Sequence, residues 1–384
     1  MNSYPQIPGR MFDCTAKHGY VTIKPNGTSK PCCRWEDYSP VIDDFQNFEQ
    51  ILDHFQGVIK TPTEQWPSGC RACHRDTSFG RKCVIDGMNK FIVPTGNTIQ
   101  SLEVGFDNIC NMNCVMCNPT YSSRWNKIYK ENKDFLDPYH DFSEYNIQSP
   151  IYDNVIRLME NSDLSRLHTI RLMGGEPMYS KVTLKFLEWF TDRDVSNIKL
   201  KFNTNATVFP HKFTELFKKF KAVEPETSID GVGQVNEWGR NGGTWKDIQE
   251  VISLWNEFAR ANSNIKMRNH TTITLANMEH LGELSEWLTQ FDQYQVRRIG
   301  IAANQYISCL STPRQFRQDL WNEQNILYED MDKYEKYEVF LGHEQNTTYE
   351  TKKIIKYIEW YDSLNTTKFQ DISPKAWKQL NTQD

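Results

Sequence analysis

The 384-residue sequence lacks any apolar run near the roughly 18 residues that indicate a membrane-spanning helix. Its start, MNSYPQIPGR, has no basic stretch followed by an apolar one, so we expect no signal peptide and a cytoplasmic location. Glycine (19) and proline (16) are too few for a fibrous or low-complexity chain. The net charge of -5 argues against nonspecific binding to a phosphate backbone. We therefore expect neither a membrane nor a nucleic acid as a partner.

The chain contains enough apolar residues to form a globular core. Hydrophobic residues make up 38% of the chain and aromatic residues 13%, which excludes a disordered protein. At roughly 150 residues per domain, the length suggests two domains with an appendage. We expect a cysteine-rich module over residues 1–95, a barrel over 96–305 and a helical C-terminal extension over 306–384.

The central part of the chain alternates between strand-like and helix-like patterns. The expected strands are Gln100–Phe106, His168–Met173, Ile198–Asn203, Glu226–Ile229, Lys266–Thr274 and Arg298–Ala303. The expected amphipathic helices are Val182–Phe190, His211–Phe220, Thr244–Arg260 and Leu281–Phe291. Strands separated by helices predict parallel βαβ units, so the fold class is α/β with a partial, TIM-like (β/α)6 barrel. Its chemistry would lie at the carboxyl ends of the strands.

The cysteines are distributed very unevenly. There are ten, and nine of them fall within the first 117 residues. A secreted disulfide scaffold would normally be short and would begin with a signal peptide. Clustered cytosolic thiols more often bind a metal, so we expect metal or iron–sulfur ligation.

Three cysteines form a compact run directly after the first expected barrel strand. Cys110, Cys114 and Cys117 have the spacing C-x3-C-x2-C. Three thiolates can hold three irons of a 4Fe–4S cluster and leave the fourth iron open. A zinc site would usually present C-x2-C pairs and a fourth ligand. In this position the run resembles the signature of the radical S-adenosylmethionine (radical SAM) enzymes.

Further segments resemble motifs of that family, in the family's order, within residues 100–305. The segment Gly174-Gly175-Glu176-Pro177 resembles the GGEP motif, in which the glycines allow close approach of the backbone and Glu176 accepts a hydrogen bond from the cofactor's ammonium. The resemblance assigns cofactor binding to these residues and to Met116, Asn203, Asn205, Ser228, Asp230 and Arg240. Met116 replaces an aromatic residue and would pack on the adenine.

In that resemblance, Ser228 and Asp230 would hydrogen-bond to ribose hydroxyls, and Arg240 would pair with the cofactor's carboxylate. The cofactors implied are a 4Fe–4S cluster and S-adenosylmethionine, with an electron donor such as flavodoxin or ferredoxin as a partner. The catalytic groups on the substrate side are not identifiable from the sequence.

The amino-terminal cysteines resemble the SPASM and twitch modules, which hold auxiliary iron–sulfur clusters. The implied ligands are Cys14, Cys32, Cys70 and Cys73, with Cys33 and Cys83 as substitutes. In most relatives this module follows the barrel, whereas here it precedes it. The alternative is a structural zinc, for which the Cys70-x2-Cys73 pair plus two more thiols is a sufficient ligand set.

The resemblance implies an enzyme that reductively cleaves S-adenosylmethionine to a 5′-deoxyadenosyl radical, which takes a hydrogen atom from a substrate. We expect the substrate to be a peptide or protein segment. The alternatives are a small sugar, nucleotide or other metabolite and, in another class, a non-catalytic scaffold that binds metal. An open iron site together with Glu176 argues against a scaffold.

Overall fold

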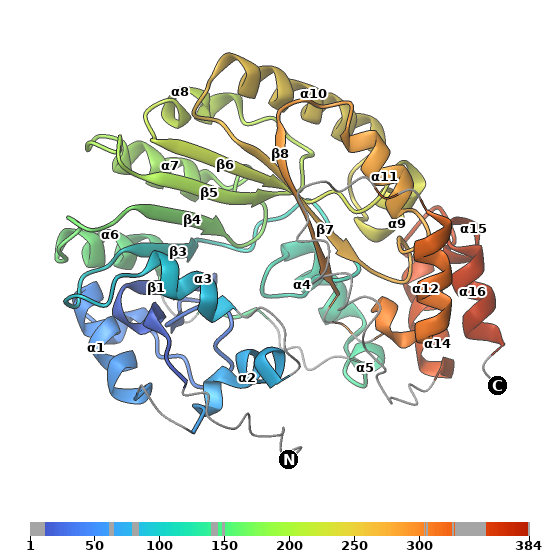
Figure 1. Cartoon of the computed structure of the whole chain (residues 1–384), viewed down its shortest axis with the longest axis horizontal. Coiled ribbons are helices and arrows are strands. Elements are labelled where there is room, and N and C mark those ends of the chain that lie inside the picture. Colours follow the sequence, from blue (N-terminus) through green and yellow to red (C-terminus); the bar gives the residue numbers. More distant parts are fainter. Residues whose placement is uncertain are drawn as a thin grey trace.

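The structure, a computed structural model, is organised around one open, curved sheet with helices along its outer side (Figure 1). It describes residues 12–60, 65–78, 84–139, 145–147, 150–302, 304, 306–324, 326 and 351–382. The amino-terminal segment lies at one side of the sheet and the C-terminal helices lie at the other (Figure 1). No helix in these ranges is both long enough and apolar enough to cross a membrane.

The sheet has eight strands in the order β2-β1-β3-β4-β5-β6-β7-β8. They are β1 (Tyr20–Ile23), β2 (Ser29–Lys30), β3 (Ser101–Gly105), β4 (Thr169–Met173), β5 (Lys199–Thr204), β6 (Ala222–Thr227), β7 (Met267–Ile273) and β8 (Tyr294–Ile301). All neighbours pair in parallel except β1 and β2, which are antiparallel. The prediction of a parallel α/β sheet is confirmed, and all six expected strands are present.

The sheet contains two strands beyond the six expected within residues 96–305. The expected barrel had six strands, but β1 adds a seventh parallel strand by pairing with β3 from Tyr20↔Ser101 to Ile23↔Val104. Short β2 then extends the edge through a hairpin with β1. The amino-terminal residues therefore complete the sheet, and their side chains share one hydrophobic cluster with those of the barrel strands.

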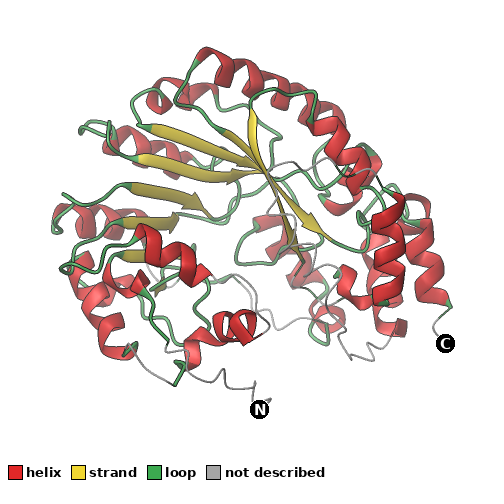
Figure 2. Ribbon diagram, viewed as in Figure 1, coloured by secondary structure: helices red, strands yellow, loops and turns green. Residues whose placement is uncertain are grey.

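Helices follow the strands along the chain, as the βαβ pattern predicts (Figure 2). They are α1 (Phe48–Val58), α2 (Arg71–Ser78), α3 (Val84–Phe91), α4 (Ser123–Glu131), α5 (Lys133–Leu136), α6 (Ile151–Glu160), α7 (Lys181–Phe190), α8 (Thr214–Phe217), α9 (Gln234–Gly239), α10 (Trp245–Ala261), α11 (Leu281–Leu288), α12 (Arg314–Glu323), α14 (Thr351–Asp362), α15 (Phe369–Ile372) and α16 (Pro374–Asn381). Short 3-10 turns are η1 (Thr15–His18), η2 (Ile42–Asp44), η3 (Ser68–Cys70), η4 (His211–Phe213) and η5 (Cys309–Ser311).

The two faces of the sheet differ sharply in polarity. Successive side chains of a strand point to opposite faces. On the outer face, Phe202 of β5 packs against Phe217 of α8 and Trp255 of α10. On the inner face, Glu224 of β6 forms ion pairs with three cations, Lys199 at 3.2 Å, Lys201 at 3.0 Å and Arg268 at 3.1 Å. The outer face therefore supplies the core, and the inner face is polar.

Because β1 is buried in the shared core, we expect it to stabilise the whole sheet. Val21 of β1 is fully buried, whereas Val58 at the end of α1 is 51% exposed. Val21→Ala should lower the free energy of unfolding by about 1–3 kcal/mol through lost burial and a cavity. The matched control Val58→Ala should change it by less than about 0.5 kcal/mol. Denaturant unfolding followed by tryptophan fluorescence measures both. Two separate transitions, only one of which responds to Val21→Ala, would contradict this expectation.

Candidate functional site

The three clustered cysteines lie together in the loop between β3 and α4, at the carboxyl ends of the parallel strands. Cys114 is buried, and Cys110 and Cys117 are half-buried. Burial and, after it, the charge of the nearby Cys114 raise the pKa of Cys110 to about 12. Burial and the other two thiols also raise the pKa of Cys117. The sequence-predicted set is therefore brought together on one short loop.

Hydrogen-bond donors surround two of these sulfur atoms. The Met112 amide donates to Cys110 Sγ at 3.4 Å, and Asn205 Nδ2 lies 3.9 Å from the same atom. Arg240 Nη1 lies 3.8 Å from Cys114 Sγ. Metal ligation requires thiolates, and N–H donors with a guanidinium stabilise a negatively charged sulfur. The donor set therefore fits a cluster held by thiolates.

The Gly174–Pro177 segment holds this loop in place. The Gly175 amide donates to the Asp107 carbonyl at 3.2 Å, and the Glu176 amide donates to the Ile109 carbonyl at 2.8 Å. A Cβ atom on Gly175 would overlap the Ile109 carbonyl oxygen. From the sequence, these glycines were expected to allow close approach to a ligand. In the structure, the approach that requires Gly175 is to the backbone in front of the first cysteine.

A second segment holds the other side of the loop. The Asn113 amide donates to the Asn241 carbonyl at 2.8 Å, and the Val115 amide donates to the Gly239 carbonyl at 2.9 Å. Gly242 has a φ of +119°, and a Cβ on it would press against the Asn111 carbonyl and Met112. The cysteine loop is thus fixed between the end of β4 and the turn after α9.

Two buried aromatic side chains that the sequence motifs do not include also hold the loop. Trp125 Nε1 of α4 donates to the Cys114 carbonyl at 2.6 Å. The Tyr361 hydroxyl of α14 donates to the Asn113 carbonyl at 2.8 Å. The two rings are stacked, with centroids 6.5 Å apart. Tyr361 is 248 residues from its partner, so no local spacing could have indicated this contact.

Glu176 is almost fully buried, and its carboxylate faces the end of β5. One oxygen accepts from the Asn205 amide at 2.6 Å and the other accepts from the Met178 amide at 3.2 Å. Burial raises the pKa of Glu176 to about 7, although these two backbone donors act in the opposite direction. The group therefore changes charge near neutral pH.

Asp230 and Arg240, which the resemblance assigned to separate contacts with the cofactor, are paired with each other. Arg240 Nε lies 2.6 Å from Asp230 Oδ2, and both side chains are buried. Asp230 Oδ1 also accepts from the Thr272 amide at 2.7 Å. This ion pair joins the segment after β6 to the turn after α9. The predicted roles toward ribose and carboxylate stay predictions.

The remaining predicted cofactor residues lie at the ends of strands or in the cysteine loop. Asn205 follows β5, and its side-chain Nδ2 donates to Asn111 Oδ1 at 2.8 Å. Ser228 follows β6 and is half-buried. Met116 is half-buried and packs against the hydrophobic core. Asn203 belongs to β5, and it faces the cavity described next.

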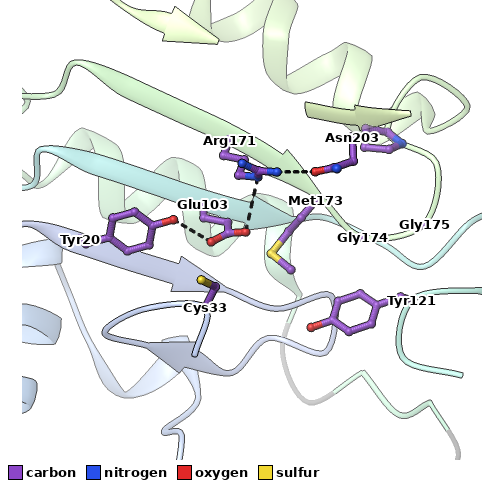
Figure 3. Close-up of a pocket in the computed structure, with 10 residues that line it drawn as sticks. Tyr20, Cys33, Glu103, Tyr121, Arg171, Met173, Gly174, Gly175 and Asn203 are labelled. Carbon is purple, nitrogen blue, oxygen red and sulfur yellow. Dashed lines mark hydrogen bonds and ion pairs between the residues drawn. The ribbon is translucent and has the colours of Figure 1, made fainter. Parts of the chain in front are cut away.

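A cavity of about 420 Å³ opens on the inner face of the sheet beside the Gly174-Gly175 segment (Figure 3). Its wall is formed by Tyr20, Cys33, Glu103, Tyr121, Arg171, Met173, Gly174, Gly175, Pro177 and Asn203. A volume in this range suits a small molecule or one end of a larger ligand. The amino-terminal segment contributes Tyr20 and Cys33, so it forms part of the cavity wall.

Comparison with known proteins identifies the central part of the chain. Residues 106–288 match the model of the Radical SAM superfamily. This match covers the loop of Cys110, Cys114 and Cys117, the Gly174–Pro177 segment and the Asp230–Arg240 pair. Residues 106–288 form a radical SAM domain. Its family implies a 4Fe–4S cluster and S-adenosylmethionine as cofactors.

Individual relatives of this radical SAM domain are distant. The chain is 27% identical over 155 residues to the radical SAM cyclopropyl synthase TigE of Paramaledivibacter caminithermalis, covering 39% of this chain and 31% of that protein. It is 14% identical to Streptococcus suis SuiB bound to S-adenosylmethionine, with a TM-score of 0.39, covering 71% and 59%. It is 16% identical to anSMEcpe with bound AdoMet, with a TM-score of 0.36, covering 52% and 51%. The chain thus spans about a third of the curated relative and about half of anSMEcpe.

The amino-terminal cysteines lie outside the matched radical SAM domain and are divided between two places. Cys14 and Cys32 both pack against a small cluster that contains Ala16 and Met88, and Cys14 contributes to the raised pKa of Cys32, after burial. Cys33 instead faces the cavity. The assignment of Cys33 as a substitute ligand for an auxiliary cluster stays a prediction.

Cys70 ends η3, and Cys73 is buried in the first turns of α2. Gly69 lies against the Trp35 ring and its carbonyl accepts from the Glu36 amide at 3.0 Å, so η3 lies beside the segment after Cys32. Cys83 lies outside the described residues. Within the described ranges, no three His, Cys, Asp or Glu side chains are grouped as ligands of a single metal ion.

If Gly175 is required by the backbone of the cysteine loop, adding one methyl group there will disturb the loop. Gly175→Ala should destabilise the protein by about 1–3 kcal/mol and lower the iron bound after reconstitution, because the loop must shift. Gly57→Ala in α1 is the control, since no atom lies within 4 Å of the added Cβ. It should be neutral or stabilising by up to about 1 kcal/mol. Thermal unfolding and iron analysis measure both effects, and normal behaviour of Gly175→Ala would refute the explanation.

Proposed function

We propose that the chain is a radical SAM enzyme that binds a 4Fe–4S cluster through Cys110, Cys114 and Cys117 and acts on a peptide or protein segment. When bound, the cluster and S-adenosylmethionine supply reductive cleavage of the cofactor and a 5′-deoxyadenosyl radical that takes a hydrogen atom from the substrate. Flavodoxin or ferredoxin is the proposed class of electron donor, and the proposed location is the cytoplasm.

The observation that carries this proposal is the fixed geometry of the cysteine loop within the radical SAM domain. Three thiols, N–H donors to two of their sulfur atoms and the ionisable Glu176 lie at one edge of the sheet. The chain's own residues position the thiolates, stabilise their charge and present a carboxylate for an ammonium group. A scaffold would not require a buried carboxylate whose pKa lies near neutrality.

The peptide assignment is supported by the cavity and its borders. The cavity is partly formed by residues of the amino-terminal segment, and its lining combines tyrosine rings with a few polar groups. Such a surface suits a flexible chain that inserts one group. The cavity volume of about 420 Å³ also favours a second candidate, a small metabolite bound whole.

We also propose that Cys14, Cys32, Cys70 and Cys73 hold an auxiliary 4Fe–4S cluster, with a structural zinc as the alternative. The proximity of Cys14 to Cys32 and of η3 to the Cys32 segment supports a shared site. A four-iron cluster binds each thiolate on a different iron, so the sulfur atoms need not meet at one point.

Iron counting after anaerobic reconstitution tests both cluster assignments. The protein should bind about eight irons, because each of two cubane clusters holds four. Replacing Cys110, Cys114 and Cys117 together by Ala should remove about half of the iron and abolish formation of 5′-deoxyadenosine. The buried Cys309 is the control, and Cys309→Ala should retain all of the iron. About four irons with one zinc in the native sequence would overturn the auxiliary cluster.

The pKa of Glu176 predicts how cofactor binding depends on pH. Since this pKa is raised to about 7, the side chain is largely neutral below pH 7 and gains its charge above it. The affinity for S-adenosylmethionine should therefore rise from about pH 6 to pH 8, as the carboxylate becomes able to pair with the ammonium.

Glu176→Gln should weaken binding roughly ten- to hundredfold at pH 8, equal to a loss of about 1.5–3 kcal/mol, and should remove the pH dependence. The exposed Glu215 supplies the control Glu215→Gln. Calorimetric titration of the reconstituted protein with S-adenosylmethionine measures these affinities. Unchanged binding by Glu176→Gln would show that the glutamate does not contact the cofactor.

A further inference from the structure

The cavity wall carries an arginine whose hydrogen-bonding capacity is only partly used. Arg171 Nη2 donates to Asn203 Oδ1 at 2.6 Å and to Glu226 Oε2 at 2.8 Å, and these two contacts fix the guanidinium plane. Among the described residues, none accepts a hydrogen bond from Nη1. The side chain is 29% exposed and lines the cavity, so the Nη1 donors are available to a ligand.

Directly across from this guanidinium lies a carboxylate, one oxygen of which accepts no hydrogen bond from the described residues. Glu103 of β3 and Arg171 of β4 are register partners. Glu103 Oε2 accepts from the Tyr20 hydroxyl at 2.7 Å and from Thr22 Oγ1 at 3.3 Å. Glu103 Oε1 is 3.8 Å from Arg171 Nε, which is beyond hydrogen-bonding distance. Figure 3 shows both side chains at the cavity wall.

The charges around this pair select against ionic ligands. A carboxylate beside Arg171 would also face Glu103 and Glu226, and an ammonium beside Glu103 would also face Arg171. A neutral amide offers a carbonyl acceptor and an N–H donor at adjacent atoms. It can satisfy the free donor and the free acceptor together without like-charge repulsion.

We propose that the cavity binds a neutral amide of the substrate, with its carbonyl accepting from Arg171 and its N–H donating to Glu103. The amide belongs either to a peptide bond or to an Asn or Gln side chain. This inference rests on the proposed peptide substrate and adds the group by which that substrate is recognised.

The site lies deeper in the sheet than the motif assigned to the cofactor. Arg171 lies on β4 three residues before Gly174, which directly follows the strand, and three extended residues correspond to roughly 10 Å. Tyr121, four residues after Cys117, and Cys33 line the same cavity. The bound amide would therefore lie at the Arg171 end of the cavity and leave its Gly174-Gly175 end to the cofactor.

Small amides test the proposal directly, because propionamide and N-methylacetamide are isomers and propionate has nearly the same shape as propionamide. Ligand-detected saturation-transfer NMR on the anaerobically reconstituted protein measures their dissociation constants, with propylammonium as the cationic probe. At least one amide should bind in the millimolar range and more tightly than propionate and propylammonium. Tighter binding of N-methylacetamide assigns the site to a peptide bond, and tighter binding of propionamide assigns it to a side chain.

Two variants locate the binding. Glu103→Gln removes a negative charge and supplies an N–H donor, so the preference for propionamide over propionate should fall by up to about tenfold. Arg171→Met removes the donors and should abolish amide binding. Arg193→Met is the control, since Arg193 lies on the surface over the Trp189 ring. If Arg171→Met fails to fold, the order of the ligand affinities in the wild type and the change of preference in Glu103→Gln still test the proposal.

Equal or tighter binding of propionate by the wild type would overturn the proposal, as would an unchanged preference in Glu103→Gln. Displacement of the amide by S-adenosylmethionine would also overturn it, because the cavity would then be the cofactor site. None of these measurements requires turnover. Failure of the proposed function appears separately, as absence of 5′-deoxyadenosine formation.

Discussion

The site depends on backbone hydrogen bonds to a loop that has no regular structure of its own. Amides of Glu176 and Val115 pair the two sides of the cysteine loop with neighbouring segments. A loop of this kind would otherwise retain much of the conformational entropy that folding must remove. The bonds to carbonyls at Ile109 and Gly239 fix where the three thiols can lie. The motif residues thus position the cysteine loop through the backbone as well as through their side chains.

Ion pairs between neighbouring strands explain why the inner face of the sheet can be polar. Buried charges are costly unless each is paired. Glu224 is surrounded by three cations, and although burial alone would raise its pKa, they hold that pKa below its usual value. Arg171 is held between Glu226 and Glu103. The apolar outer face and its helices supply the hydrophobic stabilisation, so the inner face is free to form a binding surface.

The sequence predicted most clearly those features that depend on local pattern. Strands β3, β4, β5 and β7 were found within one or two residues, because apolar side chains mark them. Strands β6 and β8 were each expected to begin four residues too late and to end two residues too late, and in β6 the charged Glu224 interrupts the apolar pattern. Strand β1 has only four residues, and its partner β3 begins about 80 residues later. Its membership of the sheet is a tertiary property that no local window contains.

For the site, motif order predicted that the cysteines and Glu176 would meet, because the carboxyl ends of parallel strands share one edge. The support from Tyr361 depends on how α14 docks, and that from Trp125 depends on how α4 folds back against the cysteine loop. The pairing of Asp230 with Arg240 was also not predicted, since each residue alone was compatible with a ligand contact.

Cys32 and Cys33 connect the amino-terminal segment to the cavity on the inner face of the sheet. Adjacent in sequence, they face different surroundings, because Cys32 packs with Cys14 against the amino-terminal cluster whereas Cys33 lines the cavity. A single peptide unit therefore separates the proposed auxiliary site from the proposed substrate cavity. A change in the geometry around Cys32 would move the cavity wall directly, since no flexible linker lies between them. The amino-terminal segment is thus a structural part of the site, with β1 as its anchor in the sheet.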